Sequence, residues 1–259
     1  MLKFCSLYSG SSGNSFLVQS NKAKILVDAG VSCKKIVEAL ASLNIDIEDI
    51  DGILVTHEHT DHTQSIGTIS KKYGTNIYAN KKTWQAMPEQ AKKIQEKNIY
   101  YFSNNETFNL KDLEILPFSI PHDAANPCGF NISNENIKIS ITTDIGHINS
   151  NVLTNLKHSK FVLLEANYEP EVLKYSRYPF NLKERISSPL GHLSNIDAGK
   201  TLNYLADFGL EHAIIAHLSN ENNFPELAYK SVLEQIDVNK KLHIEVASRN
   251  MPGRFFEVS

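Results

Sequence analysis

Two periodicities of apolar residues run along the chain and predict its strands and helices. Short apolar runs bounded by Gly, Ser or Asn are typical of strands, and they occur at 3–8, 14–19, 23–30, 52–56, 76–80, 113–118, 129–133, 137–144, 160–167, 212–217 and 241–246. Apolar residues three or four positions apart are typical of helices, and they occur over 33–43, 65–73, 149–156, 195–208 and 226–236, with 81–93 helical at least in part. Because strands and helices alternate, we expect one α/β domain over residues 1–259, with its sheets between helices.

Composition and charge exclude several classes of protein. With 259 residues, 41% of them hydrophobic, the chain can bury a sizeable core. A formal net charge of −3 excludes a wholly basic nucleic-acid wrapper but still allows a local basic patch. Three cysteines without CxxC spacing indicate reduced thiols and a cytoplasmic protein. We find neither a signal-peptide pattern at the start nor an apolar run that approaches the length of a membrane span.

The segment VTHEHTDH concentrates three histidines and two acids directly behind an apolar run. In an extended segment, residues two apart point to the same side, so His57 and His59 can face one point. Asp61 and His62 follow where the chain turns and can face a second point nearby. Nitrogen and carboxylate donors suit zinc, manganese or iron, and two such ions about 4 Å apart would hold a hydrolytic water. The alternative is that Asp61 caps a helix, with Gln64 completing a capping box, and that the histidines are polar loop residues.

One loop cannot supply enough ligands for two ions, so further ligands must come from distant parts of the chain. His122, Asp144 and His217 each follow an apolar run and should emerge at a sheet edge, where α/β folds place their sites. Taken singly, each has an ordinary structural interpretation. His122 suits a turn, Asp144 suits a helix cap, and His217 suits a satisfied position in the core. Their shared placement favours a role in a common site.

HEHTDH matches the H-x-H-x-D-H signature of the metallo-β-lactamase-fold hydrolases, which the chain resembles over essentially its full length. The resemblance implies an αββα sandwich with the site at one edge of the two sheets. It also implies two divalent ions per chain, zinc or manganese, with iron as a third option. The matching ligands are His57, His59 and His122 for one ion, Asp61, His62 and His217 for the other, and Asp144 as the bridge. Asp28 matches an acid that orients ligand side chains; its alternative is an exposed turn acid before Gly30.

Two later stretches resemble the transfer-RNA-processing ribonuclease Z. FVLLEANYEPE resembles its H-E-A-T segment, and GHLSNIDAGKTL with IIAHLS resembles its H-S-T and T-H-F-S segments. In that group a Glu and a His relay a proton to the leaving group, as an alkoxide requires, and they match Glu165 and His192. The predicted catalytic residues are therefore Asp61, Glu165 and His192. The chain departs from the motif at Leu164, where ribonuclease Z has His, and the alternatives are a strand-end ion-pair partner for Glu165 and a loop residue for His192.

SLYSGSSGNSFLV, GHLSN and IIAHLSNENN together resemble the YycJ (WalJ) group of bacterial metallo-β-lactamase-fold proteins, from residue 4 to about residue 256. That group is linked to 5′-to-3′ exonuclease activity on DNA. The loop in the first stretch has backbone N–H groups and hydroxyls with little bulk, so it can lie against a phosphate. Its members are Gly10, Ser11, Ser12, Gly13, Asn14 and Ser15. It lacks the spacing and the lysine of a P-loop, and its alternative is a flexible hairpin turn.

The resemblance implies a dimetal phosphodiesterase that acts on nucleic-acid ends, with DNA as the substrate and no membrane partner. Asp144 and His217 are about 70 residues apart, which leaves no room for the large β-CASP insertion of related nucleases. Two groups of basic residues form either a solvated face or contacts to a nucleic-acid backbone: Lys71, Lys72, Lys81, Lys82, Lys92, Lys93 and Lys97, and then Arg177, Lys183 and Arg185. The alternative function is a small-molecule hydrolase of a thioester, lactone or cyclic phosphate. The intact ligand set disfavours a non-catalytic metal-binding protein.

Overall fold

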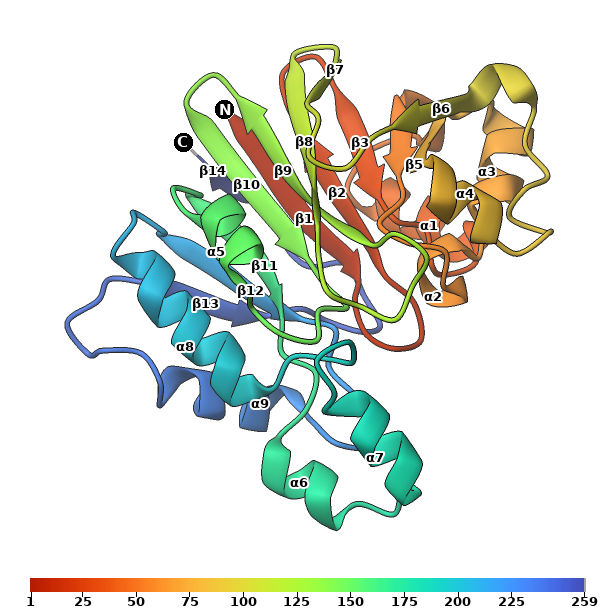
Figure 1. The fold of residues 1–259 in the computed structure, drawn as a ribbon. Coiled ribbons are helices and arrows are strands. Elements are labelled where there is room, and N and C mark those ends of the chain that lie inside the picture. The colour runs from red at the N-terminus through yellow and green to blue at the C-terminus, as the bar shows by residue number, and fades with distance from the viewer. Residues whose placement is uncertain (259) are drawn as a thin grey trace.

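Two seven-stranded sheets lie face to face, and helices cover their outer faces (Figure 1). The computed structural model describes residues 1–258. The four layers are those of an αββα sandwich, so the fold class expected from the sequence is confirmed. Within the described residues, none of the helices combines the length and the apolar character that crossing a membrane requires.

The first sheet has the strand order β14-β1-β2-β3-β4-β5-β6. Its strands are β1 (Leu2–Tyr8), β2 (Ser15–Gln19), β3 (Lys24–Val27), β4 (Gly52–Leu54), β5 (Ile77–Asn80), β6 (Ile99–Phe102) and β14 (Phe256–Val258). The pairs from β3 to β6 are parallel, and those among β14, β1, β2 and β3 are antiparallel. Every residue of β4 is buried, which explains why a central parallel strand appears in the sequence as a continuous apolar run.

The second sheet has the strand order β13-β12-β11-β10-β9-β8-β7. Its strands are β7 (Phe108–Leu110), β8 (Leu113–Ser119), β9 (Cys128–Asn134), β10 (Ile137–Thr142), β11 (Phe161–Glu165), β12 (His212–Ala216) and β13 (His243–Val246). The pairs from β10 to β13 are parallel, and those from β7 to β10 are antiparallel. Each sheet is therefore parallel in one half and antiparallel in the other.

The helices fall into three groups in Figure 1. Beside the first sheet lie α1 (Cys33–Ser42), α2 (Thr60–Thr63), α3 (Ile66–Tyr73), α4 (Lys81–Ala86) and the 3₁₀ turns Ile47–Asp49 and Glu96–Asn98. The second sheet is covered by α5 (Ser150–Leu156), α8 (Asn195–Ala206) and α9 (Pro225–Leu233). The third group, α6 (Pro170–Tyr175) and α7 (Phe180–Ile186), projects away from both sheets.

The main core lies between the two sheets and contains apolar side chains from both. Phe4 of β1 and Phe161 of β11 meet there with their ring centroids 4.6 Å apart. Separate apolar clusters fill the space under α1 and α3 and the space under α5, α8 and α9. Burial of apolar surface therefore holds the two sheets together.

Six strands end at the same edge of the sandwich and carry the candidate site residues there. β3 and β4 are parallel, and so are β10, β11 and β12, while β8 shares the direction of β10 because both are antiparallel to β9. The residues at or just beyond these strand ends are Asp28, His57, His122, Asp144, Glu165 and His217. This parallel arrangement explains how ligands far apart in the sequence can meet.

The structure departs from the expected elements in a few places. Of the segment 81–93, expected to be helical at least in part, only Lys81–Ala86 is α-helical. The helix ends there because Met87 precedes Pro88 and a residue before proline disfavours helical backbone. β6, β7, β14, α2, α6 and α7 are additional to the expected elements. All six are short, and the periodic pattern that identifies an element weakens with its length.

Candidate metal centre and active site

The loop after β4 places four candidate ligands around one short helix. His59 is the residue before α2, and its side chain makes no capping hydrogen bond. Asp61 and His62 lie within α2, so the alternative in which Asp61 caps a helix is wrong. The loop is pinned underneath, because the hydroxyl of Thr63 donates to the backbone oxygens of Glu58 and His59 at 3.2 and 3.0 Å.

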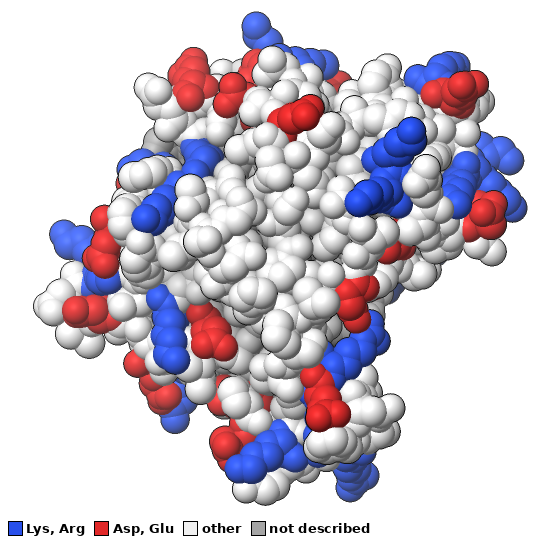
Figure 2. All heavy atoms as spheres, in the orientation of Figure 1, with Lys and Arg blue, Asp and Glu red and all other residues white. Residues whose placement is uncertain are grey.

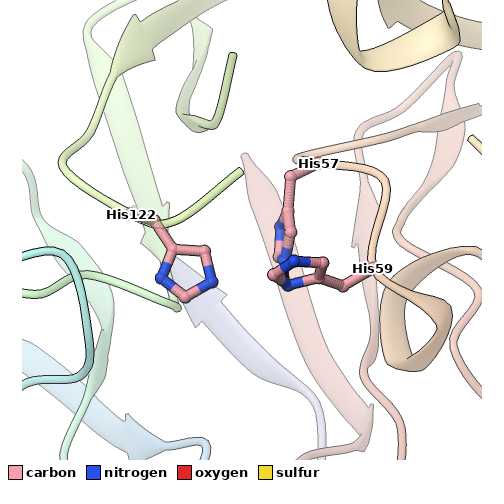
Figure 3. A group of neighbouring side chains, drawn as sticks. All are labelled: His57, His59 and His122. Carbon is pink, nitrogen blue, oxygen red and sulfur yellow. Dashed lines mark hydrogen bonds between the residues drawn. The ribbon is translucent and has the colours of Figure 1, made fainter. Parts of the chain in front are cut away.

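His57, His59 and His122 converge from the loop after β4 and the loop after β8 (Figure 3). Their three ligand nitrogens lie within 4.8 Å of one another. The Nδ1 atom of His122 lies 3.1 Å from the backbone oxygen of Gly191, which fixes the ring and leaves Nε2 facing the group. Burial, joined by the charges of His62 and other histidines, holds the pKa of His57 well below its usual range. His57 is therefore neutral, as a metal-binding imidazole must be.

Asp61, His62 and His217 form a second group with ligand atoms within 4.8 Å of one another. Asp144 lies between the two groups. Its Oδ2 atom is 2.9 Å from His62 Nε2 and 2.8 Å from His217 Nδ1, and its Oδ1 atom is 3.8 Å from His122 Nε2. Burial alone would raise the pKa of Asp144, but the charges of His217 and His62 hold it well below its usual range. Asp144 is therefore an ionised carboxylate that faces both histidine groups.

Three buried atoms at this point lack a hydrogen-bond partner: His122 Nε2, Asp144 Oδ2 and His217 Nδ1. Asp144 approaches His62 and His217 closely, but the approach is not aligned as a hydrogen bond. Unpaired buried polar atoms cost about 1–3 kcal/mol each, so a cluster of them indicates a missing partner. Imidazole and carboxylate donors that face a shared space fit divalent cations such as zinc or manganese. The interpretation of His217 as a satisfied core histidine is therefore wrong, and Asp144 does not cap α5, because Asn149 does.

A buried acid orients the His62 ring. Asp28 is fully buried, and its Oδ2 atom lies 2.7 Å from His62 Nδ1. Thr56 donates to the same carboxylate twice, from its backbone N–H at 2.9 Å and from its hydroxyl at 2.8 Å. Because Nδ1 carries the hydrogen toward Asp28, Nε2 of His62 faces the ligand group. The alternative of an exposed turn acid is wrong for Asp28.

In the metal-free protein, His62 binds a proton more strongly than a free imidazole does. Burial alone would lower its pKa, but the charges of Asp144, Asp28 and Asp61 raise it well above its usual range. The proton on His62 thus offsets part of the negative charge that a bound cation would neutralise.

Glu165 and His192 form the contact expected of a proton relay. Glu165 is fully buried, and its Oε1 atom lies 2.7 Å from His192 Nδ1. Its Oε2 atom accepts the backbone N–H of Ile145 at 2.7 Å, which fixes the carboxylate. Burial alone would lower the pKa of His192, but the charge and hydrogen bond of Glu165 and the charge of Asp144 raise it to about 9. His192 lines a cleft of about 180 Å³ beside the ligand groups, together with Ser11, Asp123 and Arg185.

Three of the site residues have left-handed backbone. The φ angles of Asp28, Asp144 and His217 are 61°, 56° and 55°. Positive φ is uncommon outside glycine and is least unfavourable for Asn, Asp and His. Each of these residues lies one or two positions beyond the end of a strand, so the left-handed turn redirects the chain just where a ligand or its support is needed. Such strain concentrates at functional sites.

Most of the Gly/Ser loop packs against the segments that carry the candidate ligands, and only a small part of it faces the cleft. The side chain of Asn14 bridges Gly10 and the region of His62, with Nδ2 3.1 Å from His62 Nε2. Ser15 donates to the backbone oxygen of Asp28 at 2.9 Å. Gly10, Gly13, Asn14 and Ser15 are buried, and only Ser11 and Ser12 are exposed. The predicted phosphate contact of the whole loop therefore stays a prediction for two residues only. These are Ser11, which lines the cleft, and its neighbour Ser12.

Several residues that support the site were missed by the sequence analysis. Ser9 accepts the backbone N–H of His217 at 2.8 Å. Asp123 Oδ1 lies 3.3 Å from His122 Nε2, and its Oδ2 accepts Arg185 Nε at 2.7 Å. Gly30 passes so close to the backbone oxygen of Asp61 that an added Cβ would lie 1.6 Å away. Of the supporting residues, only Thr56 and Asp123 could have been found from the sequence, because each is adjacent to a candidate ligand.

Fold, ligand groups and comparisons define the class of protein. A model of the Beta-lactamase superfamily domain matches residues 23–218, and the chain belongs to this family. The match includes Asp28 and the whole set of candidate ligands from His57 to His217, so it coincides with the geometry described above.

Individual relatives narrow the similarity further. The chain is 39% identical over 237 residues to "Exodeoxyribonuclease WalJ" of Streptococcus pneumoniae strain D39, covering 90% of this chain and 88% of the relative. It is 36% identical over 236 residues to "Exodeoxyribonuclease YycJ" of Bacillus anthracis, covering 91% and 89%. The crystal structure of the metallo-β-lactamase fold protein YhfI from Bacillus subtilis covers 97% of this chain with a TM-score of 0.74 at 16% identity, which shows the fold. The resemblance to the YycJ (WalJ) group is thus confirmed.

Proposed function

We propose that the chain is a dimetal-dependent nuclease that removes nucleotides from DNA ends in the 5′-to-3′ direction. The observation that carries the proposal is the 2.7 Å contact between Glu165 and His192 at the edge of the candidate metal centre. A phosphodiester of a nucleic acid expels an alkoxide, which needs a proton, whereas thioester and lactone cleavage has less need of one. Two relatives of this chain are named as exodeoxyribonucleases, which supports DNA as the substrate. Their names also support the class of enzyme, a metal-dependent hydrolase.

We assign the metal ligands as two sets that share one carboxylate. They are His57, His59 and His122, then Asp61, His62 and His217, with Asp144 common to both. A bound pair of zinc or manganese ions would supply an activated water and neutralise charge on the scissile phosphate. Asp28 orients His62 through Nδ1, and Thr56 holds Asp28 in place.

The chain's own groups manage the leaving-group proton. His192 is a charged imidazolium at neutral pH, because the neighbouring carboxylates raise its pKa to about 9. Glu165 accepts the Nδ1–H of His192, so the proton available to the substrate is the one on Nε2 at the cleft. When His192 gives up that proton, the Glu165 carboxylate still orients the neutral ring for the next cycle.

End dependence and cellular context follow from the surroundings of the site. Ser11 is exposed and lines the cleft with His192, so its hydroxyl can contact a terminal phosphate. The 5′-to-3′ polarity rests on the similarity to the named relatives. We place the protein in the cytoplasm as a single domain, supported by the free thiols of Cys5, Cys33 and Cys128.

The proposal is tested with linear DNA duplexes labelled at one end or the other, a closed circle, RNA, a thioester and a lactone, with Mn²⁺ or Zn²⁺ supplied. Early release of the 5′ label with the circle intact is expected. Cutting of the circle would make the protein an endonuclease. Turnover of the thioester or lactone without action on any nucleic acid would establish the small-molecule function instead.

Matched variants connect the activity with the site. His192→Ala should reduce release of the label by about 10²–10⁴-fold, the usual weight of general acid catalysis. His243→Ala changes an exposed histidine on β13 and should have no effect. Equal loss in both variants would show that the assay does not report the Glu165–His192 pair.

A further inference from the structure

The chain between Glu165 and His192 forms a small helical lobe of its own. It contains α6 and α7 and projects from the end of β11 (Figure 1). Its apolar cluster is separate from the main cores and consists of Tyr168, Leu173 and Ile186, with Tyr178 and Leu182 packed against them. The lobe thus begins and ends at the two residues of the proposed proton relay, so its position relative to the cleft is fixed at both ends.

Two large aromatic side chains on the lobe are exposed without a structural reason. The exposed fractions of Tyr175 and Phe180 are 75% and 74%. Tyr175 ends α6 and Phe180 begins α7. A groove of about 550 Å³ lies on the lobe, and Leu173, Tyr178 and Phe180 line it. Phe180 is thus an exposed ring that lines an apolar groove, and Tyr175 is a second exposed ring beside the groove residue Lys174, which indicates a binding surface.

The lobe is positively charged in a chain of net charge −3. Residues 166–191 contain the four basic residues Lys174, Arg177, Lys183 and Arg185 against the three acids Glu169, Glu171 and Glu184, a net charge of +1. Figure 2 shows Lys and Arg side chains, interspersed with acids, over this projecting part of the molecule. The ammonium of Lys174 lies 5.0 Å from the ring centroid of Tyr175, and Lys174 and Lys183 both line the groove. Flat rings and ammonium groups therefore occur together.

The groove adjoins the active-site cleft at Tyr178. Tyr178 lines both the groove, with Phe180, and the cleft, with His192. Arg185 lines the cleft, where it pairs with Asp123, and Lys174 and Lys183 line the groove together with Glu184. A ligand that extends from His192 would pass Tyr178 and reach Phe180.

We propose that the α6–α7 lobe binds single-stranded nucleic acid at the end of the substrate. This inference rests on the proposed nuclease function. Unpaired bases stack on Phe180 and Tyr175, while Lys174 and Lys183 contact the phosphates, the combination that binds single strands without reading sequence. A duplex suits the surface less well, because its bases are already stacked on each other. The positive charge selects a polyanion over a neutral protein segment.

The experiment compares Phe180→Ala and Tyr175→Ala with Tyr229→Ala, which removes a 40% exposed aromatic ring from α9. Binding of a labelled single-stranded oligonucleotide to the metal-free protein is measured by fluorescence anisotropy. We expect the dissociation constant to rise roughly five- to hundredfold for each lobe variant, given the usual weight of base stacking on an aromatic ring. Tyr229→Ala should bind as the unaltered protein does. Lys183→Gln should reduce the slope of log affinity against log salt by about 0.7.

A kinetic comparison separates this inference from the proposed function. Duplexes with an unpaired 5′ overhang, blunt duplexes and bis(p-nitrophenyl) phosphate are assayed with Mn²⁺. In Phe180→Ala the rise in KM should be at least fivefold greater for the overhang than for the blunt duplex or the ester. Equal losses on all three, or unchanged oligonucleotide binding, would refute the lobe as a single-strand surface while nuclease activity stood. Hydrolysis of the ester without action on DNA by the unaltered protein would refute the nuclease itself.

Discussion

His192 Nδ1 lies 2.7 Å from Glu165 Oε1, although the two residues are 27 positions apart and the helical lobe separates them in the chain. The neighbouring carboxylates raise the pKa of His192 to about 9, so the residue is protonated and able to donate at neutral pH. As pH rises through this pKa the donor is lost. Bound cations would lower the pKa by repulsion, which places the expected fall in kcat at or below pH 9.

A pH–rate profile checks this role of His192. His192→Asn should lower kcat by about 10²–10⁴-fold and remove the alkaline fall. An ester with a nitrophenolate leaving group needs no proton and should suffer less. Loss of metal from the variant, or equal loss on both kinds of ester, would instead make His192 a ligand or a structural residue.

Metal content is the second prediction. Two divalent ions per chain should bind at saturation, because seven candidate ligands in overlapping groups are too many for one ion. His59→Ala and Asp61→Ala should each lower the content and abolish hydrolysis while the fold remains. Since the pKa of His62 is raised, metal binding should release a proton and strengthen as pH rises. Elemental analysis that never exceeds one ion per intact chain would contradict the two-ion assignment.

Asp28→Asn tests the support of His62. The amide has the size of the carboxylate but cannot hold the Nδ1 hydrogen as strongly, so metal affinity should fall about 10- to 100-fold. Competition with a chromophoric chelator measures the change. Asp112→Asn is the matched control, since Asp112 is also an acid held by hydrogen bonds, from Ser20 at 2.6 Å and Asn134 at 3.0 Å. An equal decrease in the two variants would show that Asp28 has no specific effect on the metal centre.

Gly30→Ala tests the contact behind the metal loop. A Cβ there would lie 1.6 Å from the Asp61 oxygen and 2.8 Å from the Asn14 nitrogen, so backbone must move. We expect a loss of roughly 3 kcal/mol of unfolding free energy, the upper range of overpacking, together with weaker metal binding. Gly209→Ala meets no atom within 4 Å at a φ of 87° and should cost only about 1–2 kcal/mol of left-handed strain. Chemical denaturation of both variants checks the difference.

The sequence predicted the sheets better than their surroundings. Buried parallel strands such as β4 and β11 appear as uninterrupted apolar runs. Polar groups follow such runs directly, so at five of the six strand ends that carry site residues the expected strand reached or adjoined a candidate residue. β6 was missed because Tyr100 and Tyr101 are exposed at a sheet edge, which breaks the apolar pattern. The lobe was missed because each of its helices is short and its aromatic residues lie on the surface.

The candidate site was partly predictable for a related reason. The spacing H-x-H-x-D-H reports four ligands because they share one loop, and the resemblance supplied the distant ones. The contacts of Ser9 and Gly30 with the ligand segments depend on tertiary structure alone. Extent as a single domain, the two-ion count and the individual ligand assignments stay predictions.

The left-handed backbone at Asp28, Asp144 and His217 changes how these positions should be dissected. Alanine there would remove the functional group and also force an unsuited residue into positive φ, so one measurement would mix two effects. Asparagine tolerates that conformation, and it therefore isolates the loss of charge or of the imidazole. The difference between the Ala and Asn variants at one position then reports the conformational energy of the left-handed turn together with the contacts that the amide side chain keeps.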